Sequence, residues 1–328
     1  MVCHVVRILY LCGRFSIDIN KTIYFIIMTN IKNFNDLISH LVKRGTRKRV
    51  AIVWAADEST QYAAIRALND GFIDAIFVGC REQLEQQELL KPHAEHITYV
   101  DTDDKDKAAA IAVQMVRDGQ ADVLMKGLIN TDNLLRAVLN KETGILPKGH
   151  VLTHVTTAQI PGYDHLLFFT DAAVIPCPTR EQRIEQVRYV SGLCRSFGVA
   201  EPKIALIHCS EKVNEKHFPF TVEYRELVQM AQDGEFGPCI VDGPLDVKTS
   251  CNLHSMETKG INSPIHGEAD AVIFPDIQAG NVFYKTLTLW AKAETAGILQ
   301  GPTAPVVTPS RSDSGECKYY SMAVACMA

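Results

Sequence analysis

The chain has 328 residues, of which 47% are hydrophobic and 22% are charged, a globular balance with enough apolar material for one large domain or two smaller ones. Its net charge of −5 excludes a general basic surface, so we expect neither nucleic acid nor an anionic membrane as a partner. The ten cysteines are scattered without a C-x-x-C pair. This argues against a secreted disulfide framework or a zinc site and favours a reducing cytoplasm.

The first 27 residues differ from the rest of the chain. Their short apolar pieces are interrupted by charged residues, among them Arg14, Asp18 and Lys21. These charges break any signal-peptide core, and neither apolar piece is long enough to span a bilayer. We interpret residues 1–27 as a non-native extension or a disordered tail, and we expect the native chain to start at Met28.

Beyond Met28, short apolar runs typical of buried strands alternate with helical patterns. The alternation predicts an α/β fold with mostly parallel sheets and helices on both faces. Strands are predicted at 49–55, 75–78, 97–100, 121–125, 151–155, 166–169, 204–207, 239–241 and 271–274. Helices are predicted at 34–42, 62–68, 81–90, 105–117, after 131, 179–198, from 280 to about 294, and at 315–325.

A stretch rich in Gly and Pro at residues 144–149 interrupts this series. We interpret it as a domain boundary. The predicted architecture is therefore two α/β/α domains with a cleft between them.

The first candidate site is the segment that directly follows the strand at 121–125. Ligands of open α/β sheets bind at the carboxyl ends of strands. Lys126 stands there, Gly127 would allow a close backbone approach, and Thr131 could cap the next helix. Arg136 follows one turn later and could hold a phosphate with two parallel hydrogen bonds. The Walker pattern is absent, which disfavours ATP hydrolysis.

The second candidate is the helix predicted to start at Gly280. Asn281 and Lys285 stand four residues apart and so share one helix face near its start. Free N–H groups and the positive dipole end make such a helix start suitable for an anion. The plainer interpretation is that Asn281 only caps the helix and Lys285 only faces solvent.

Four segments resemble one known family. They are residues 123–138 (V-L-M-K-G-L-I-N-T-D-N-L-L-R-A-V), 275–285 (P-D-I-Q-A-G-N-V-F-Y-K), 291–301 (A-K-A-E-T-A-G-I-L-Q-G) and 309–314 (P-S-R-S-D-S). They are similar to the phosphate acetyl/butyryl transferases, and the spacing around Gly243–Asp246, Lys259 and Ser263 resembles the butyryl branch. The resemblance runs from about residue 49 to the C-terminus.

The resemblance implies reversible exchange of a short acyl group, most simply butanoyl, between coenzyme A and inorganic phosphate. It also implies a cytoplasmic homodimer or larger homo-oligomer without a metal or redox cofactor, in an architecture like that of isocitrate and isopropylmalate dehydrogenases. Residues 299–328 would return to the first domain, giving domains of 28–148 plus 299–328 and of 149–298.

The third candidate site is the turn that contains Ser310, Arg311 and Asp313. Acyl transfer from an acyl phosphate to a thiol needs a base, an oxyanion donor and a cation for the departing phosphate. Ser310 could donate to the oxyanion, Arg311 could bind the phosphoryl group, and Asp313 could take the thiol proton. The acetyl branch carries its base where this chain has Cys317, so Glu316 stays an alternative, and ordinary helix capping also explains the S-D-S sequence.

Three alternatives to a phosphate butyryltransferase stay open. One is a phosphate acetyltransferase, and another is a metal-dependent decarboxylating dehydrogenase, whose aspartate cluster and arginine group we do not find. The third is a two-domain solute-binding protein, which predicts an export signal that the chain lacks.

Several other polar residues have plainer explanations. His150 and His154 stand four apart, but no third ligand lies at metal-site spacing, so structural roles are favoured. Turn chemistry explains Asp171 and Asp276, although each follows a strand and a cleft role stays open. Lys259 could contact a phosphate of coenzyme A, but a solvated lysine is more common.

Overall fold

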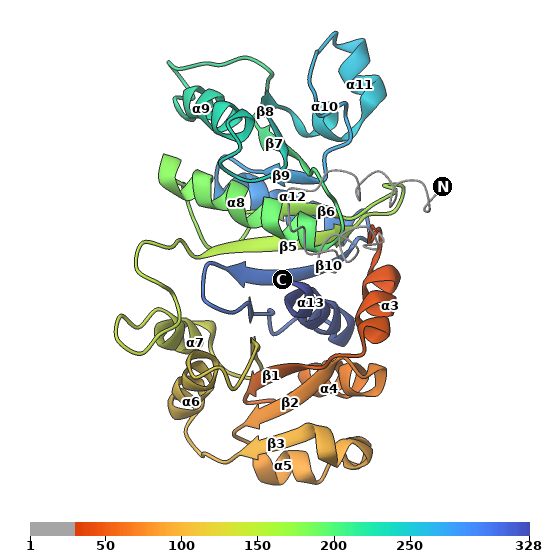
Figure 1. Ribbon diagram of the computed structural model, residues 1–328, viewed down its shortest axis with the longest axis vertical. Coiled ribbons are helices and arrows are strands. Elements are labelled where there is room, and N and C mark those ends of the chain that lie inside the picture. The colour runs from red at the N-terminus through yellow and green to blue at the C-terminus, as the bar shows by residue number, and fades with distance from the viewer. Residues whose placement is uncertain (1–29) are drawn as a thin grey trace, which may run out of the picture. The chain divides into compact units, whose positions relative to one another are not determined.

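The structure is a computed structural model that describes residues 30–328. Residues Ile31–Ala328 form one compact unit. The extension predicted for residues 1–27 and the start expected at Met28 lie outside the described residues. Figure 1 shows the helices of this unit packed along the two faces of its strands.

The unit is built on an eleven-stranded sheet with the order β3-β2-β1-β4-β11-β10-β5-β6-β9-β7-β8. Neighbouring strands are parallel except where β10 pairs with β5 and β11, and where β5 pairs with β6. The predicted α/β fold with a mostly parallel sheet is therefore confirmed. The strands are β1 Lys48–Val53, β2 Ile73–Val78, β3 Ile97–Val100, β4 Val123–Lys126, β5 Thr153–Gln159, β6 Leu167–Thr170, β7 Lys203–Ile207, β8 Ile240–Leu245, β9 Ala271–Ile273, β10 Glu294–Gln300 and β11 Val306–Val307.

The helices start and end at residues whose chemistry favours a boundary. The side chain of Asn33 caps α3 and Gly45 ends it in the left-handed region. A capping box formed by Thr179 and Gln182 starts α8. The helices are α3 Phe34–Arg44, α4 Glu58–Asp70, α5 Arg81–Glu85, the 3-10 helix η1 Glu88–His96, α6 Lys105–Arg117, α7 Thr131–Val138, α8 Arg180–Ser196, α9 Phe220–Gln232, α10 Val247–Cys251, α11 Leu253–Thr258, α12 Ile277–Leu289 and α13 Gly315–Met327.

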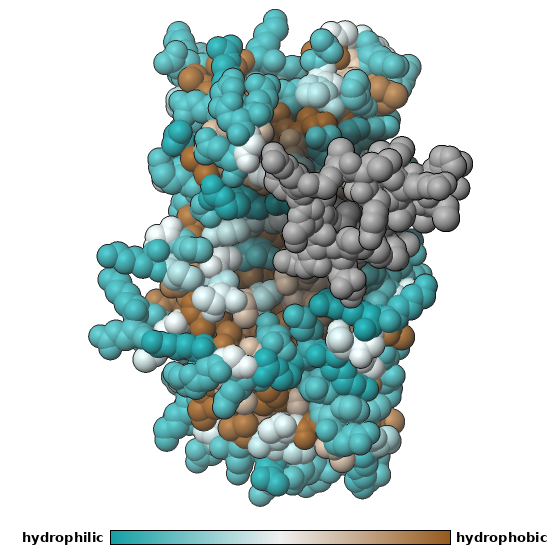
Figure 2. Space-filling model, viewed as in Figure 1, coloured by the Kyte–Doolittle hydropathy of each residue, from teal (hydrophilic) through white to brown (hydrophobic). Residues whose placement is uncertain are grey.

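Helices cover both faces of the sheet because its central strands bury both sets of alternating side chains. On β1, Val50 and Ile52 join a core cluster that includes residues of α4 and α13. Ala51 and Val53 point the other way, into a cluster with residues of α6 and α7. Hydrophilic side chains cover most of the described surface on the face seen in Figure 2.

Residues 290–300 differ from the prediction. The sequence pattern predicted a helix from 280 to about 294, whereas α12 spans Ile277–Leu289 and β10 spans Glu294–Gln300. β10 pairs with β5 over seven residues, and Ala296, Ile298 and Leu299 are each at most 1% exposed. A strand buried on both faces lacks the alternation that marks a strand in sequence, which explains the error.

The sheet continues through both predicted domains. Strands β1 to β4 and β11 lie at one end of the strand order, and β5 to β10 lie at the other. Helix α13 packs against α3, α4 and β10. The division into 28–148 with 299–328 and 149–298 stays a prediction, and so does the dehydrogenase-like architecture.

Candidate functional site

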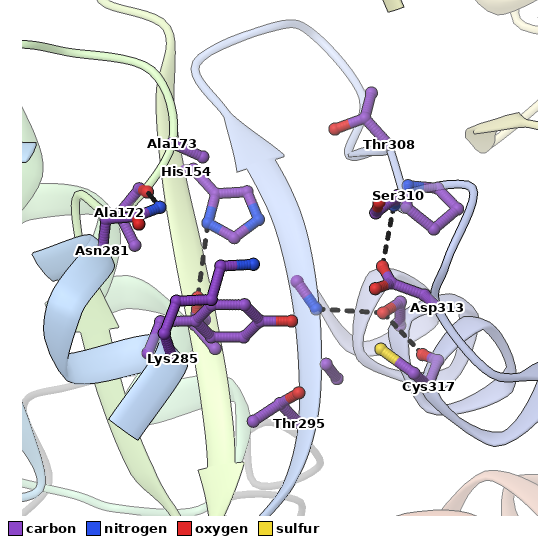
Figure 3. A pocket seen from close by; sticks show the side chains of 16 residues that line it. His154, Ala172, Ala173, Asn281, Lys285, Thr295, Thr308, Ser310, Asp313 and Cys317 are labelled. Carbon is purple, nitrogen blue, oxygen red and sulfur yellow. Dashed lines mark hydrogen bonds between the residues drawn. The ribbon is translucent and has the colours of Figure 1, made fainter. Parts of the chain in front are cut away.

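The largest group of predicted site residues meets at one cavity. The cavity has a volume of about 180 Å³ and lies between β5, β10, α12 and the turn that leads into α13. In Figure 3, Asn281, Lys285 and His154 lie on one side of β10, with Ser310 and Asp313 on the other. The residues that line the cavity include His154, Asn281, Tyr284, Lys285, Thr295, Gly297, Ser310, Asp313 and Cys317.

The turn before α13 is held together by its own polar groups. The Ser310 backbone N–H donates to Oδ2 of Asp313 over 2.7 Å, and the Asp313 N–H donates to the carbonyl of Ser310 over 3.1 Å. The hydroxyls of Ser310 and Ser312 lie 3.0 Å apart. Ser314 caps α13 through the N–H of Cys317. The capping role considered for the S-D-S sequence thus belongs to Ser314, while Ser310 and Asp313 line the cavity.

Arg311 points away from this turn toward the loop between β4 and α7. It is exposed, and its guanidinium donates a hydrogen bond to the side-chain oxygen of Asn130. Arg311 forms no ion pair with any described residue. A guanidinium has five N–H donors, so most of them stay available to a bound anion.

Helix α12 starts three residues earlier than predicted, which corrects the anion-site hypothesis for Gly280 and Asn281. Asp276 is its N-cap, and the N–H of Gly280 already donates to the Asp276 carbonyl. Gly280 has a packing role, because a Cβ there would lie 2.2 Å from the backbone oxygen of Asp171. Asn281 donates to the Ala172 carbonyl over 3.0 Å. These two residues therefore position α12 against the loop after β6.

Lys285 is exposed at the edge of the cavity. Its Nζ lies 5.0 Å from the centre of the Tyr284 ring, a contact in the range of cation–π interactions. Among the described residues it has no carboxylate partner within ion-pair distance. Lys285 is thus a cation beside the cavity whose charge is not already neutralised.

The cavity also contains a histidine to which the sequence analysis assigned a structural role. Nδ1 of His154 lies 3.3 Å from Oγ1 of Thr156. A Cβ at Gly297 on β10 would lie 2.5 Å from Nε2 of His154, so only glycine at this position leaves room for the imidazole ring. Burial lowers the pKa of His154, against the opposing charges of Asp171 and Asp313. At neutral pH the ring is therefore uncharged.

Two further cavity residues were also missed. Burial and the charge of Asp313 raise the pKa of Tyr284 to about 12 and that of Cys317 to about 11. Both groups therefore keep their protons at neutral pH. Tyr284 lies ten residues after the nearest predicted strand end, Cys317 lies farther away, and no sequence motif brings them together with His154.

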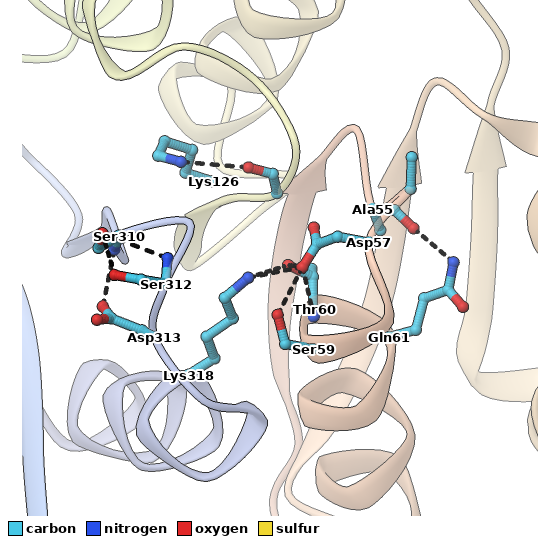
Figure 4. A network of polar contacts seen from close by, with 12 residues as sticks. Ala55, Asp57, Ser59, Thr60, Gln61, Lys126, Ser310, Ser312, Asp313 and Lys318 are labelled. Carbon is cyan, nitrogen blue, oxygen red and sulfur yellow. Dashed lines mark hydrogen bonds and ion pairs between the residues drawn. The ribbon is translucent and has the colours of Figure 1, made fainter.

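Lys126 lies on the other side of the same turn, within a buried polar network (Figure 4). It is 2% exposed, and its Nζ donates to the Gly127 carbonyl over 3.3 Å. Burial lowers its pKa, and the charges of Lys318 and Arg311 lower it further. No described carboxylate lies within ion-pair distance of this ammonium. A buried cation without a partner marks a place where an anion would be stabilised.

The neighbouring Lys318 has the partner that Lys126 lacks. It is 3% exposed, and its Nζ lies 2.6 Å from Oδ1 of Asp57 and 3.0 Å from Oγ1 of Thr60. Burial would raise the pKa of Asp57, but hydrogen bonds from Lys318, Thr60 and Ser59 lower it to about 2. This pair joins α13 to the start of α4 and was not predicted.

Thr131 and Arg136 lie apart from the cavity. Helix α7 starts at Thr131 and its N-cap is Asn130, so the expected capping role of Thr131 is wrong. Arg136 is exposed and borders a hollow between α6 and α7, together with Asp106 and Asn133. The structure does not bring Arg136 to the residues that line the cavity.

Comparisons with known proteins agree on one family. Residues 103–326 match the family described as phosphate acetyl/butaryl transferase, which is more than half of the chain. The chain belongs to this family. It is 37% identical to the phosphate butyryltransferase of Clostridium acetobutylicum, covering 90% of this chain and 98% of that protein. It is 34% identical to the phosphate acetyltransferase of Thermotoga maritima, covering 86% and 95%.

Solved structures of phosphotransacylases share the fold. A branched-chain phosphotransacylase from Enterococcus faecalis V583 superimposes with a TM-score of 0.75 at 30% identity, covering 85% of this chain and 98% of that one. A phosphotransacetylase from Streptococcus pyogenes has a TM-score of 0.75 at 22% identity, covering 90% and 98%. The resemblance predicted from the sequence motifs is therefore confirmed.

Within this family assignment, Glu316 is poorly placed as the alternative base. Its carboxylate forms an ion pair with Arg66 and accepts from the Tyr62 hydroxyl over 2.8 Å. Burial would raise its pKa, but these hydrogen bonds keep it below the usual range. Glu316 does not line the cavity that contains Asp313.

Two other residues are held by structural contacts. Nζ of Lys259 lies 2.8 Å from Oε1 of Glu211 and 2.5 Å from Oδ2 of Asp246, so these two carboxylates compensate its charge. Asp171 accepts the Thr153 hydroxyl over 2.8 Å and the Ala173 N–H over 2.8 Å. Turn chemistry thus accounts for Asp171, as expected.

Neither a metal cluster nor a membrane helix is found in the part of the chain that the structure describes. No group of three or more His, Cys, Asp or Glu side chains there could hold a metal ion. No helix of residues 30–328 is long and apolar enough to cross a membrane.

Proposed function

We propose that this acyltransferase moves a short acyl group, most favourably butanoyl, reversibly between coenzyme A and inorganic phosphate. One observation carries the proposal. The Ser310–Asp313 turn, whose sequence resembles the family signature, meets α12 and β5 around a cavity of about 180 Å³. The phosphate butyryltransferases of Clostridium acetobutylicum and Clostridium beijerinckii match 90% of this chain at 37% and 35% identity. These findings do not favour a decarboxylating dehydrogenase or a solute-binding protein.

The reaction needs no covalent enzyme intermediate. The thiolate of coenzyme A attacks the carbonyl carbon of the acyl phosphate, the carbon–oxygen bond to phosphate breaks, and phosphate leaves with the electron pair. In reverse, a phosphate oxygen attacks the thioester and the thiolate leaves. Both substrates must therefore be bound together, and their orientation contributes much of the rate.

Each member of the turn has a distinct role in this proposal. The Ser310 hydroxyl donates to the oxyanion that forms on the acyl oxygen. The guanidinium of Arg311 binds the phosphoryl group, because its planar fork matches two phosphate oxygens. Asp313 supplies the negative charge that favours removal of the thiol proton. Asp313 can do this while it holds the Ser310 N–H, because a carboxylate has two oxygens.

The cations outside the turn would bind the other negative groups of the substrates. Lys126 lies beside Arg311 and would favour the phosphoryl group that Arg311 holds, with the backbone of Gly127 allowing a close approach. Lys285 would bind a phosphate of coenzyme A at the edge of the cavity, and Asn281 would hold the helix in place. Arg136 and Thr131 stay predicted contacts of coenzyme A.

The length of the acyl chain is the least constrained part of the proposal. Relatives at 37% and 34% identity are named for butanoyl and acetyl transfer respectively, and the Enterococcus faecalis structure is named for branched chains. One methylene group changes selectivity by only about 1–3 kcal/mol. We propose butanoyl as the preferred group and acetyl as the alternative.

The setting of the enzyme is also proposed. We propose a cytoplasmic homo-oligomer of two α/β/α domains with a cleft between them, which uses acyl-CoA and phosphate and needs no metal or redox cofactor. The free thiols of the described cysteines, Cys194 and Cys326 buried among them, are consistent with a reducing compartment.

A thiol-release assay tests this function. Purified protein is mixed with butanoyl-CoA or acetyl-CoA, with and without phosphate, and free thiol is followed with a chromogenic reagent. We expect phosphate-dependent release that is faster with butanoyl-CoA. Arg311→Ala should lower kcat/KM for phosphate by about 10²-fold or more, whereas the matched variant Arg225→Ala, at an exposed arginine of α9 that does not line the cavity, should change it by less than about 3-fold. A folded protein that releases no thiol from any short acyl-CoA would overturn the proposal.

A further inference from the structure

We propose that His154 is the group that accepts the thiol proton of coenzyme A. The inference rests on the proposed function, and it assigns to His154 the role of base that the sequence predicted for Asp313. In the forward step the S–H bond breaks and its proton passes to Nε2 of His154. The sulfur then attacks the acyl carbon while phosphate leaves. The imidazolium then gives the proton to the departing phosphate, which leaves as hydrogen phosphate. In the reverse step hydrogen phosphate attacks the thioester and its proton passes through His154 to the departing sulfur, so atoms and charge balance.

The position of His154 is what a proton acceptor for the cavity requires. It projects from β5 into the same cavity as Ser310 and Asp313. Its backbone N–H donates to Oδ2 of Asp171 over 3.2 Å, and Asp171 is itself 2% exposed. The buried carboxylate of Asp171 therefore fixes the backbone of His154. The same carboxylate also accepts hydrogen bonds from the Thr153 hydroxyl and the Ala173 N–H.

The two ring nitrogens have different surroundings. Nδ1 lies 3.3 Å from Oγ1 of Thr156, an oxygen that can accept the Nδ1 proton and leave Nε2 with a free electron pair. Nε2 lies over Gly297, where a Cβ would be 2.5 Å away. Gly297 also lines the cavity. The absence of a side chain at this one position of β10 leaves space for the reactive nitrogen.

The other ionisable groups of the cavity are less suitable acceptors. Tyr284 and Cys317 hold their protons, because burial raises their pKa values to about 12 and about 11. Lys285 is an ammonium and has no acceptor. Asp313 holds the Ser310 N–H with one oxygen, and its charge opposes the effect of burial on the pKa of His154, so it serves His154 as a counter-charge.

The charges that face His154 come from three elements. Asp171 lies in the loop after β6 and Asp313 in the turn before α13, and both oppose the effect of burial on the pKa of His154. Lys285 lies on α12, which borders the same cavity. A histidine that gains a proton in the field of Asp313 is stabilised by that negative charge, which favours the imidazolium. The arrangement therefore favours a ring that is uncharged before the reaction and charged during it.

The first test compares His154→Gln with the matched variant His150→Gln, since His150 is exposed and does not line the cavity. Acylation of coenzyme A by butanoyl phosphate is followed across pH. We expect His154→Gln to lower kcat by about 10²-fold near pH 7. The loss should shrink to about 10-fold or less near pH 9, because the thiol ionises unaided above its pKa of about 8.5. His150→Gln should stay within about 2-fold of wild type throughout.

The variant Gly297→Ala provides a second test of the role of His154 if His154→Gln folds poorly. Gly297→Ala should displace the ring and lower kcat by about 10-fold or more. Adding Gly297→Ala to His154→Ala should then cause almost no further loss, because both changes remove the same group. A purely structural role for Gly297 would make the two losses multiply.

The outcomes separate this inference from the function on which it rests. Wild-type protein that transfers no acyl group would overturn the proposed function. Active wild type with a His154→Gln variant of unchanged kcat near pH 7, or with a loss that is equal at every pH, would overturn only the role of His154. Unfolding midpoints within a few degrees of wild type confirm that each variant is folded.

Discussion

The turn between β11 and α13 separates two polar regions that differ in how their charges are compensated. In the buried network, Lys318 is matched by Asp57 at 2.6 Å. In the cavity, neither Asp313 nor Lys285 has an ion-pair partner among the described residues. Charges that already have partners contribute to the fold, whereas uncompensated charges around an open cavity are available to substrates. Lys126 is buried near the network but has no carboxylate partner, so it belongs with the second group.

The largest effect that this comparison predicts is on stability. Lys318→Met would leave the Asp57 carboxylate without its cation, which costs about 3–5 kcal/mol when a partly buried pair loses one member. Urea unfolding near pH 7 measures the free energy, with exposed Lys107→Met as the matched control. Asp57→Asn combined with Lys318→Met should recover part of the loss. Equal stability of Lys318→Met and wild type would contradict the structural role.

The same pair gives the molecule a specific dependence on acid. The pKa of Asp57 is lowered to about 2, below its value of about 3.9 in an unfolded chain. A lowered pKa contributes stability that is present above about pH 4 and is lost as the pH falls toward 2. In Lys318→Met the folded pKa lies closer to the unfolded one. The unfolding free energy of this variant should therefore change less between about pH 5 and pH 2 than that of wild type.

Smaller effects, on activity alone, should distinguish Asp313 from Glu316. These are the two carboxylates that the sequence left as alternatives for the base. Asp313→Asn keeps an oxygen for the Ser310 N–H but removes the charge, so kcat should fall by about 10²-fold. Glu316→Gln should stay within about 3-fold of wild type, because Glu316 pairs with Arg66 away from the cavity. Steady-state thiol release measures both. A larger loss for Glu316→Gln than for Asp313→Asn would show that the wrong region was assigned to catalysis.

Much of the fold could be predicted from the sequence because the parallel strands are short, apolar and separated by helical patterns. β3 was predicted at its observed residues, Ile97–Val100, and the other strands from β1 to β9 were predicted within a few residues of their ends. β10 was missed because it is buried on both faces between β5 and β11. Its apolar run has no period of two, and it follows a helix without a clear stop signal.

The site was less predictable because its residues come together only through tertiary contacts. Ser310 and Asp313 were found from a local motif, and Lys285 from its helix face. His154 was assigned a structural role because nothing in its neighbourhood shows that Gly297, far along the chain, leaves room for its ring. Ion pairs between distant residues cannot be predicted from the sequence either. Glu316 was therefore left as an alternative base, whereas the structure shows that it forms an ion pair with Arg66.

The central claim is that acyl transfer takes place in the cavity beside Ser310, and one matched pair tests it most directly. Ser310 and Ser312 stand in the same turn with their hydroxyls 3.0 Å apart, but only Ser310 lines the cavity. The measurement is kcat/KM for phosphate-dependent thiol release from butanoyl-CoA in Ser310→Ala and Ser312→Ala. We predict a loss of about 10²-fold for Ser310→Ala and of less than about 5-fold for Ser312→Ala. Equal rates for the two variants, or a greater loss for Ser312→Ala, would contradict the account.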